Sequence, residues 1–233
     1  MKTIVLLLLC CAGVCMAQEK AKAGPAAPDL AKLQAMTARF APTPLRVDTS
    51  MLSAGDQKAL VKLIQASRIV NRIFMQQFWG GDLEAYSKLQ SDSSPLGRAR
   101  LHYFWLNKGP WSEIDQYQAF LPGVPARKLP GANFYPEDMT KQEFESWVET
   151  LSPAEKEQAL GFFTVIRRGS GGKLTIVPYS KEYKTDLDAA GTLLREAAAL
   201  TTNASLKKFL LARASAFASR SEEHTSELQS RHN

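Results

Sequence analysis

Residues 129–140 read Leu-Pro-Gly-Ala-Asn-Phe-Tyr-Pro-Glu-Asp-Met-Thr, and the elements predicted on either side are organised around this stretch. Pro130 and Pro136 each hold φ near one value and disfavour the helical region for the preceding residue, so we predict a stiff, pre-shaped loop. Thr140 and Glu143 form a Thr-x-x-Glu capping signature in front of an apolar run. The loop is therefore predicted to lead directly into a helix.

Four polar or aromatic side chains of this loop stand at the predicted helix entrance: Asn133, Tyr135, Glu137 and Asp138. Such a set can line a binding cleft, but it can also pack as a plug between helices, and packing loops outnumber binding loops. The proline-rich, irregular region around it extends over residues 109–140, and long structureless stretches in a compact domain tend to be functional or to cover another domain. Both interpretations stay open, with the four side chains as candidates for a cleft wall.

Helical patterns dominate the remaining sequence. Capping residues and apolar spacings of three and four predict helices over residues 30–40, 53–79, 82–90, 96–108, 183–200 and 204–218, and helices beginning at Thr140 and Ser152. The longest of them carries one predicted apolar stripe, formed by Leu60, Leu63, Ile64, Val70, Ile73, Phe74 and Phe78. Leu45–Val47, which follows Pro42 and Pro44 and precedes this helix, is expected to lie extended against the core.

The apolar pattern changes from helical to β-like over residues 162–178. Two β-rich runs flank the segment Arg168-Gly-Ser-Gly-Gly172, which predicts a β-hairpin. No strand–glycine–Lys-Ser/Thr–helix order follows these glycines, so they do not form a phosphate-binding loop. The predicted fold class is mainly α with a small β-hairpin, that is, α+β.

The first 17 residues are typical of a signal peptide. Lys2 gives a positive start, residues 4–9 are apolar, and Cys15-Met-Ala17 is a small-x-small cleavage pattern. The apolar core is too short for a membrane span, which takes about 20 apolar residues. We therefore expect an exported protein, periplasmic or secreted. Lipoprotein anchoring is the weaker alternative, because no small residue precedes a cysteine in the required way. Residues 18–29 are predicted to be a flexible leader, and residues 30–219 a single helical lobe.

Cysteine and charge exclude several function classes. All three cysteines lie in the predicted signal peptide, so the mature chain has no disulfide, no cysteine nucleophile and no thiolate metal ligand. The net charge of +6 is modest, and no basic run interleaves with aromatics, so we predict no nucleic-acid partner. His102 has no second histidine at metal-ligand spacing, and we expect a packed or surface histidine.

Residues 220–233 show neither a periodic apolar pattern nor the residues typical of turns. The run Arg-Ser-Glu-Glu-His-Thr-Ser-Glu-Leu-Gln from residue 220 onward matches an in-frame translation of a common sequencing-adapter oligonucleotide. We predict that this tail is an artefact, and that its acidic and histidine residues are not a metal cluster. The natural gene is then expected to continue beyond the body of the chain.

With the tail set aside, most of residues 50–219 resembles the dipeptidyl-peptidase III family of zinc peptidases, in its exported bacterial branch. The resemblance is carried by the loop at 129–140, Phe163-Thr-Val-Ile-Arg167, Val177-Pro-Tyr-Ser180 and the closing helices at 193–217.

The resemblance implies a two-lobed, largely helical exopeptidase that releases dipeptides from peptides bound in a wide cleft. In the family, His-Glu-x-x-x-His holds zinc and activates water, but no His-Glu pair occurs in this sequence. It therefore implies the helical N-terminal lobe of a larger protein, with the C-terminal, zinc-binding lobe missing. Zinc and peptide substrate are implied for the full-length parent only. We assign no catalytic and no metal residue, and expect this chain to be inactive alone.

Two other classes remain. The chain could be a complete, non-catalytic helical module that binds a peptide or protein through its proline-aromatic region. A nucleotide hydrolase receives little weight: some relatives of the family are fused to such a domain, but its glycine-and-glutamate signature is missing here.

Overall fold

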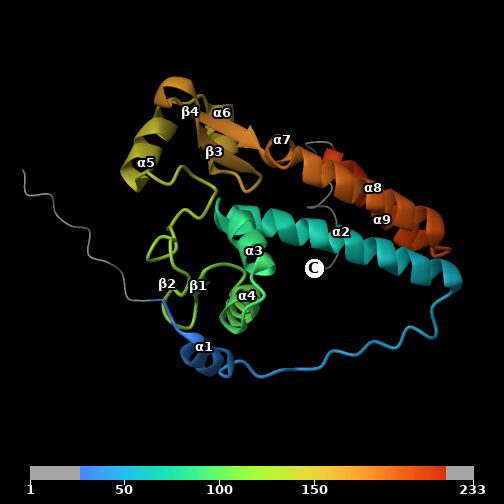
Figure 1. The fold of residues 1–233 in the computed structure, drawn as a ribbon. Helices are drawn as coiled ribbons and strands as arrows, with labels where there is room; N and C mark the ends of the chain where they lie inside the picture. The colour runs from blue at the N-terminus through green and yellow to red at the C-terminus, as the bar shows by residue number, and fades with distance from the viewer. Residues whose placement is uncertain (1–26, 219–233) are drawn as a thin grey trace, which may run out of the picture.

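The structure, a computed structural model, describes residues 27–218. Within them the chain is mostly helical, with two small antiparallel strand pairs, so the predicted fold class is confirmed (Figure 1). The elements are α1 (Leu30–Thr37), α2 (Ala54–Phe78), α3 (Asp82–Ser91), α4 (Pro95–Asn107), β1 (Trp111–Ser112), β2 (Gln118–Ala119), α5 (Lys141–Glu149), α6 (Pro153–Leu160), β3 (Thr164–Arg168), the 3₁₀ turn η1 (Ser170–Gly172), β4 (Leu174–Pro178), α7 (Tyr179–Glu182), α8 (Lys184–Leu200) and α9 (Ala204–Ala218).

The long helix α2 lies alongside α8, which in turn packs against α9 (Figure 1). Small side chains occupy the buried contact lines, which lets the backbones approach closely: Ala59, Ala66, Ala197, Ala198 and Ala214. Thr201, just after α8, donates a hydrogen bond of 2.5 Å to the Asp56 carboxylate in the first turn of α2. The two ends of this layer are therefore tied together by a polar contact as well as by packing.

The apolar stripe predicted on α2 is divided between two environments. Ile73 is buried, whereas Ile64, Val70 and Phe74 are about half exposed. At about 100° per residue the predicted stripe is too wide for one neighbouring helix to cover. Ala59 and Ala66 are buried against α8 and α9, whereas Ile73 packs with Val165 of the hairpin and Tyr183.

A second core joins α1, α3 and α4 to the segment after α4. Tyr103 and Phe104 of α4 are fully buried, and the Tyr103 ring meets Phe120 edge-on at 4.7 Å between centroids. Beside them β1 pairs with β2, which places Trp111 opposite Ala119. The helices predicted at 30–40, 82–90 and 96–108 are thus present with similar bounds.

The hairpin predicted over residues 162–178 is present as β3 and β4. They pair antiparallel from Thr164 opposite Pro178 to Arg168 opposite Leu174. The turn between them uses positive φ at Gly171 (70°) and Gly172 (78°), a conformation that glycine adopts without a Cβ clash. α5 and α6 cover the hairpin through a small core of Val148, Ala159, Ile166 and Leu174.

The segment between α1 and α2 does not behave as expected. Leu45 is 91% exposed and Val47 is 83% exposed, so the prediction that Leu45–Val47 lies against the core is wrong. In Figure 1 this segment runs extended from α1 to the start of α2. Pro42 and Pro44 keep it from joining a helix, and it is not part of either strand pair of the described chain.

The predicted signal peptide, most of the predicted leader and the predicted artefactual tail lie outside the described residues. Between residues 27 and 218, no helix has the length and apolar character needed to cross a lipid bilayer.

Candidate functional site

Asn133 joins the 129–140 loop to the end of α2. Its side-chain amide donates a hydrogen bond of 2.7 Å to the Gln76 carbonyl, and its backbone N–H donates one of 2.9 Å to the Gln77 carbonyl. The last carbonyls of a helix have no partner inside the helix. Asn133 therefore satisfies two of them from a loop more than fifty residues further along the chain.

The middle of the loop packs against the hairpin layer. The Tyr135 ring meets Phe144 of α5 edge-on, with 5.2 Å between centroids. The carbonyl of the neighbouring Phe134 accepts a hydrogen bond of 2.8 Å from the backbone N–H of Ile166 in β3. Through these contacts the loop connects α2 to both α5 and the hairpin, and its backbone is held in place.

The acidic end of the loop is exposed and lies near Arg168. The Arg168 guanidinium, at the end of β3, lies 3.2 Å from an Asp138 oxygen and 2.8 Å from a Glu143 oxygen. These hydrogen bonds, the one with Glu143 foremost, raise the pKa of Arg168, and the same guanidinium lowers the pKa of Glu143. Glu137 is exposed and makes no hydrogen bond or ion pair with any other residue between 27 and 218.

The four candidate residues thus divide into two pairs. Asn133 and Tyr135 contact α2 and α5, whereas Glu137 and Asp138 lie exposed at the end of the loop, where Asp138 contacts Arg168. One of the two hydrogen bonds of the capping box predicted at Thr140 is confirmed, since the Thr140 hydroxyl accepts a hydrogen bond of 3.1 Å from the Glu143 backbone N–H.

A second polar cluster was not predicted from the sequence. The Asp115 carboxylate accepts hydrogen bonds of 2.6 Å from both Arg39 and Ser112, and Ser112 in turn is 2.9 Å from the Tyr103 hydroxyl. The Arg39 guanidinium, with help from Ser112, lowers the pKa of Asp115 to about 2. No local signal relates these residues, since Arg39 and Asp115 lie 76 positions apart.

Asp82, at the start of α3, is the other feature that the sequence did not reveal. Its side chain is fully buried, and neither carboxylate oxygen has a hydrogen-bond partner among the described residues. Burial raises its pKa to about 8, an effect that the charge of Lys128 partly opposes. The Lys128 ammonium itself lies 4.1 Å from the centroid of Phe78. Because Asp82 is not accessible to solvent, a substrate cannot reach it, and its effect is on stability.

The described residues do not fit a zinc site. Residues 27–218 contain no group of three or more His, Cys, Asp or Glu side chains that could hold a metal ion. His102 lies exposed on α4. We therefore derive no catalytic step through a metal for the described part of the chain.

Comparison with solved structures gives two strong similarities. Dipeptidyl-peptidase III from Corallococcus sp. strain EGB is 48% identical, with a TM-score of 0.79 over 84% of this chain and 36% of that one. The chain is similar to part of dipeptidyl-peptidase III. The DPP III structure from Caldithrix abyssi agrees, at 39% identity and a TM-score of 0.75 over 81% of this chain and 35% of that one. The chain thus spans about a third of each DPP III chain.

A curated relative carries a different name. A protein of Arabidopsis thaliana named Nudix hydrolase 3 is 34% identical over 80% of this chain and 30% of its own length. No protein-family model matches the chain. Because the matched region is less than a third of that plant protein, its name says little about the region shared with this chain.

Proposed function

We propose that the chain works as part of an exported, zinc-dependent exopeptidase of the dipeptidyl-peptidase III type, which releases dipeptides from peptides. The observation that carries the proposal is the 48% identity and TM-score of 0.79 over 84% of the chain with a dipeptidyl-peptidase III. In this proposal the zinc ligands and the catalytic base belong to a C-terminal lobe outside the described residues. The described lobe contributes binding surface and no catalytic residue.

The proposed contribution of this lobe is one wall of the peptide cleft, formed by Asn133, Tyr135, Glu137 and Asp138. Two observations support it. The exposed carboxylates of Glu137 and Asp138 offer negative charge to a peptide ammonium group. The backbone of the loop is held at Asn133 and Phe134, so the wall would not have to be ordered when a peptide binds.

The test begins with the gene. Extending the reading frame from genomic DNA beyond codon 219 should reveal His-Glu-x-x-x-His, and the extended protein should cleave dipeptidyl substrates only with zinc bound. The chain of 233 residues alone should cleave none. An extended gene without that motif, or an extended zinc-loaded protein that cleaves no peptide, would contradict the proposal.

The cleft wall has its own test in the extended protein. Glu137→Gln and Tyr135→Phe should raise KM for peptides several-fold while the melting temperature changes little. Glu145→Gln is the matched control, because Glu145 is an exposed acid on α5 whose one ion pair within residues 27–218 is with Lys141, at 3.6 Å. Unchanged KM with a lowered melting temperature would return the loop to a packing role.

The name of the plant relative, Nudix hydrolase 3, raises a second candidate, a nucleotide hydrolase. The glycines of the described hairpin turn bridge two antiparallel strands and do not precede a helix that could bind phosphate. Incubating the full chain with magnesium and a nucleoside diphosphate compound should yield no product. A non-catalytic peptide- or protein-binding module remains the alternative, and a cooperative melt of the isolated chain together with peptide binding in the absence of any extension would favour it.

A further inference from the structure

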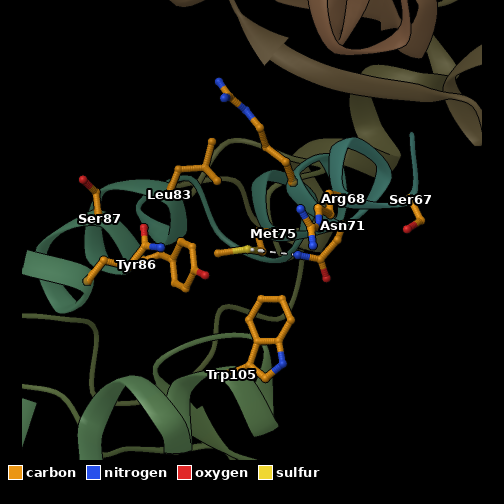
Figure 2. Close-up of a pocket in the computed structure, with 10 residues that line it drawn as sticks. Ser67, Arg68, Asn71, Met75, Leu83, Tyr86, Ser87 and Trp105 are labelled. Carbon is orange, nitrogen blue, oxygen red and sulfur yellow. Dashed lines mark hydrogen bonds between the residues drawn. The ribbon is translucent and has the colours of Figure 1, made fainter. Parts of the chain in front are cut away.

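A pocket of about 750 Å³ lies between α2, α3 and α4, apart from the 129–140 loop (Figure 2). α2 and α3 are joined by a short turn at Gly80 and Gly81, so they form a hairpin that opens away from the turn. Both helices line the pocket with one face at spacings of three and four, and α4 adds one aromatic residue. The lining residues are Ser67, Arg68, Asn71, Arg72 and Met75 of α2, Leu83, Tyr86, Ser87 and Gln90 of α3, and Trp105 of α4.

The part of the pocket nearest the turn is apolar. Met75 is only 2% exposed and lies there with Leu83. The rings of Tyr86 and Trp105 approach each other to 6.0 Å between centroids, with 31° between their planes. Figure 2 shows both rings beside the contact between Met75 and Asn71. This end of the pocket suits an apolar or aromatic group.

The other end of the pocket is cationic. Arg68 and Arg72 stand one helical turn apart, and the lining residues within 27–218 include no acidic side chain. Arg68 forms no ion pair with another residue in the described range, and Arg72 has one long contact, 3.4 Å, with Asp186. The Lys108 ammonium lies 3.1 Å from the centroid of the Trp105 ring, so a positive charge also lies beside the aromatic part of the pocket.

Hydrogen-bond donors complete this end. Among the described residues, the side-chain amide of Asn71 donates only to the Met75 sulfur, at 3.6 Å, and sulfur is a weak acceptor. An incoming oxygen would be a better partner for this amide. The pocket therefore combines an apolar end, two aromatic rings and a guanidinium-rich mouth within one cavity.

We propose that this pocket binds a carboxylate attached to an apolar group, namely the C-terminal residue of a peptide with an apolar or aromatic side chain. The side chain would lie against Met75 and Tyr86, and the carboxylate would face Arg68 and Arg72, because a guanidinium pairs with a carboxylate through two parallel hydrogen bonds. The choice of a peptide as the source of the carboxylate rests on the proposed function. A diphosphate is the poorer occupant, since the described lining of the pocket contains no glycine-rich loop of backbone N–H groups.

The experiment is a binding titration of the full 233-residue chain with N-acetyl-L-phenylalanine, followed by calorimetry and by tryptophan fluorescence. N-acetyl-L-phenylalanine amide, which lacks the carboxylate, and phenyl phosphate are titrated in parallel. We expect saturable binding of the carboxylate and at least ~10-fold weaker binding of the amide, because the amide lacks the charge-assisted hydrogen bond, which is worth that factor or more. Phenyl phosphate should bind no more tightly than the carboxylate, because the described lining of the pocket offers no loop of backbone N–H groups to a phosphate.

Variants locate the site. Arg68→Gln and Trp105→Leu should each weaken binding at least ~10-fold with the circular dichroism spectrum unchanged. Lys58→Gln is the matched control, since it removes one positive charge from the exposed surface of the same helix away from the pocket lining, and it should leave the affinity unchanged.

The inference would be overturned by no saturable binding, by equal binding of acid and amide, or by an affinity that Arg68→Gln does not change. Tighter binding of phenyl phosphate than of the carboxylate would also overturn it. None of these results bears on the peptidase proposal, which is tested by cleavage with the extended protein.

Discussion

Replacing Asp82 with asparagine is expected to stabilise the protein at neutral pH. The side chain is fully buried at the start of α3, and neither carboxylate oxygen has a hydrogen-bond partner among the described residues. A buried carboxylate without a partner is costly only when it is charged, and asparagine keeps the shape of the side chain without the charge.

The size of the effect follows from the pKa of Asp82. Burial raises it from 3.8 to about 8, so between these values the folded protein holds a proton that the unfolded chain has lost. Stability therefore falls as the pH rises through this window. From 3.8 to pH 7 is about three units, and at ~1.4 kcal/mol per unit the aspartate costs ~4 kcal/mol of unfolding free energy at pH 7. Below about pH 4 the side chain is neutral in both states, so the two proteins should be equally stable.

The assay is urea unfolding of the full chain and of Asp82→Asn at half-unit steps from pH 4 to 8.5. The urea midpoint of the wild type should fall steadily as the pH rises above 4, whereas the midpoint of the variant should not. The two proteins should have equal m-values. Glu84→Gln is the matched control, because this substitution removes one charge from the same helical turn at a residue that is 73% exposed. The pair with Lys88 lowers the pKa of Glu84, so this variant differs from wild type only near the low end of the pH range and should keep the wild-type fall in stability from about pH 5 to 8.

Parallel pH profiles for wild type and Asp82→Asn would refute the reasoning, because they would mean that the carboxyl group has the same pKa in the folded and unfolded protein. A variant less stable than wild type at pH 7 would show that the charged carboxylate has a favourable partner.

Three further predictions follow from single contacts. Asn133→Ala should destabilise the protein by ~1–2 kcal/mol in chemical unfolding, because the Gln76 carbonyl loses its donor; an unchanged midpoint would show that the loop does not hold the end of α2. Asp115→Asn should remove ~1–2 kcal/mol at pH 7 and less as the pH falls from about 4 towards 2, since the wild-type contribution depends on an ionised, partly exposed Asp115 whose pKa is about 2; a loss that stays constant down to pH 2 would contradict this. Gly55→Ala should cost ~1–3 kcal/mol, measured as a lower melting temperature, because a Cβ there would collide with the Leu200 carbonyl, whereas an unchanged or higher melting temperature would show that α2 and α8 can separate without cost.

The candidate loop was recognisable from its composition, but the roles of its residues were not. Two prolines and a capping threonine were enough to predict a stiff loop that leads into α5, and the Thr140 cap is present. The partner of Asn133 is a carbonyl 57 positions earlier, and nothing near Asn133 in the sequence indicates it. The pocket lined by Arg68 and Trp105 was missed for the same reason, since its walls come from three separate helices.

The sequence by itself determined where the helices begin and where the hairpin turns. The side-chain oxygens of Ser53, Ser152 and Asn203 each accept a hydrogen bond from the backbone N–H three residues further on. Such hydrogen bonds depend only on neighbouring residues. Glycine at positive φ determines the hairpin turn in the same local way. The tertiary structure alone decided which charges are paired and which are buried. Asp82 reads as an ordinary acidic residue at a helix start, where the dipole favours it, yet the packing around α3 excludes water from it and leaves it without a hydrogen-bond partner in the described chain. Burial and long-range pairing depend on which faces of the helices pack together, and the local sequence does not specify which faces meet.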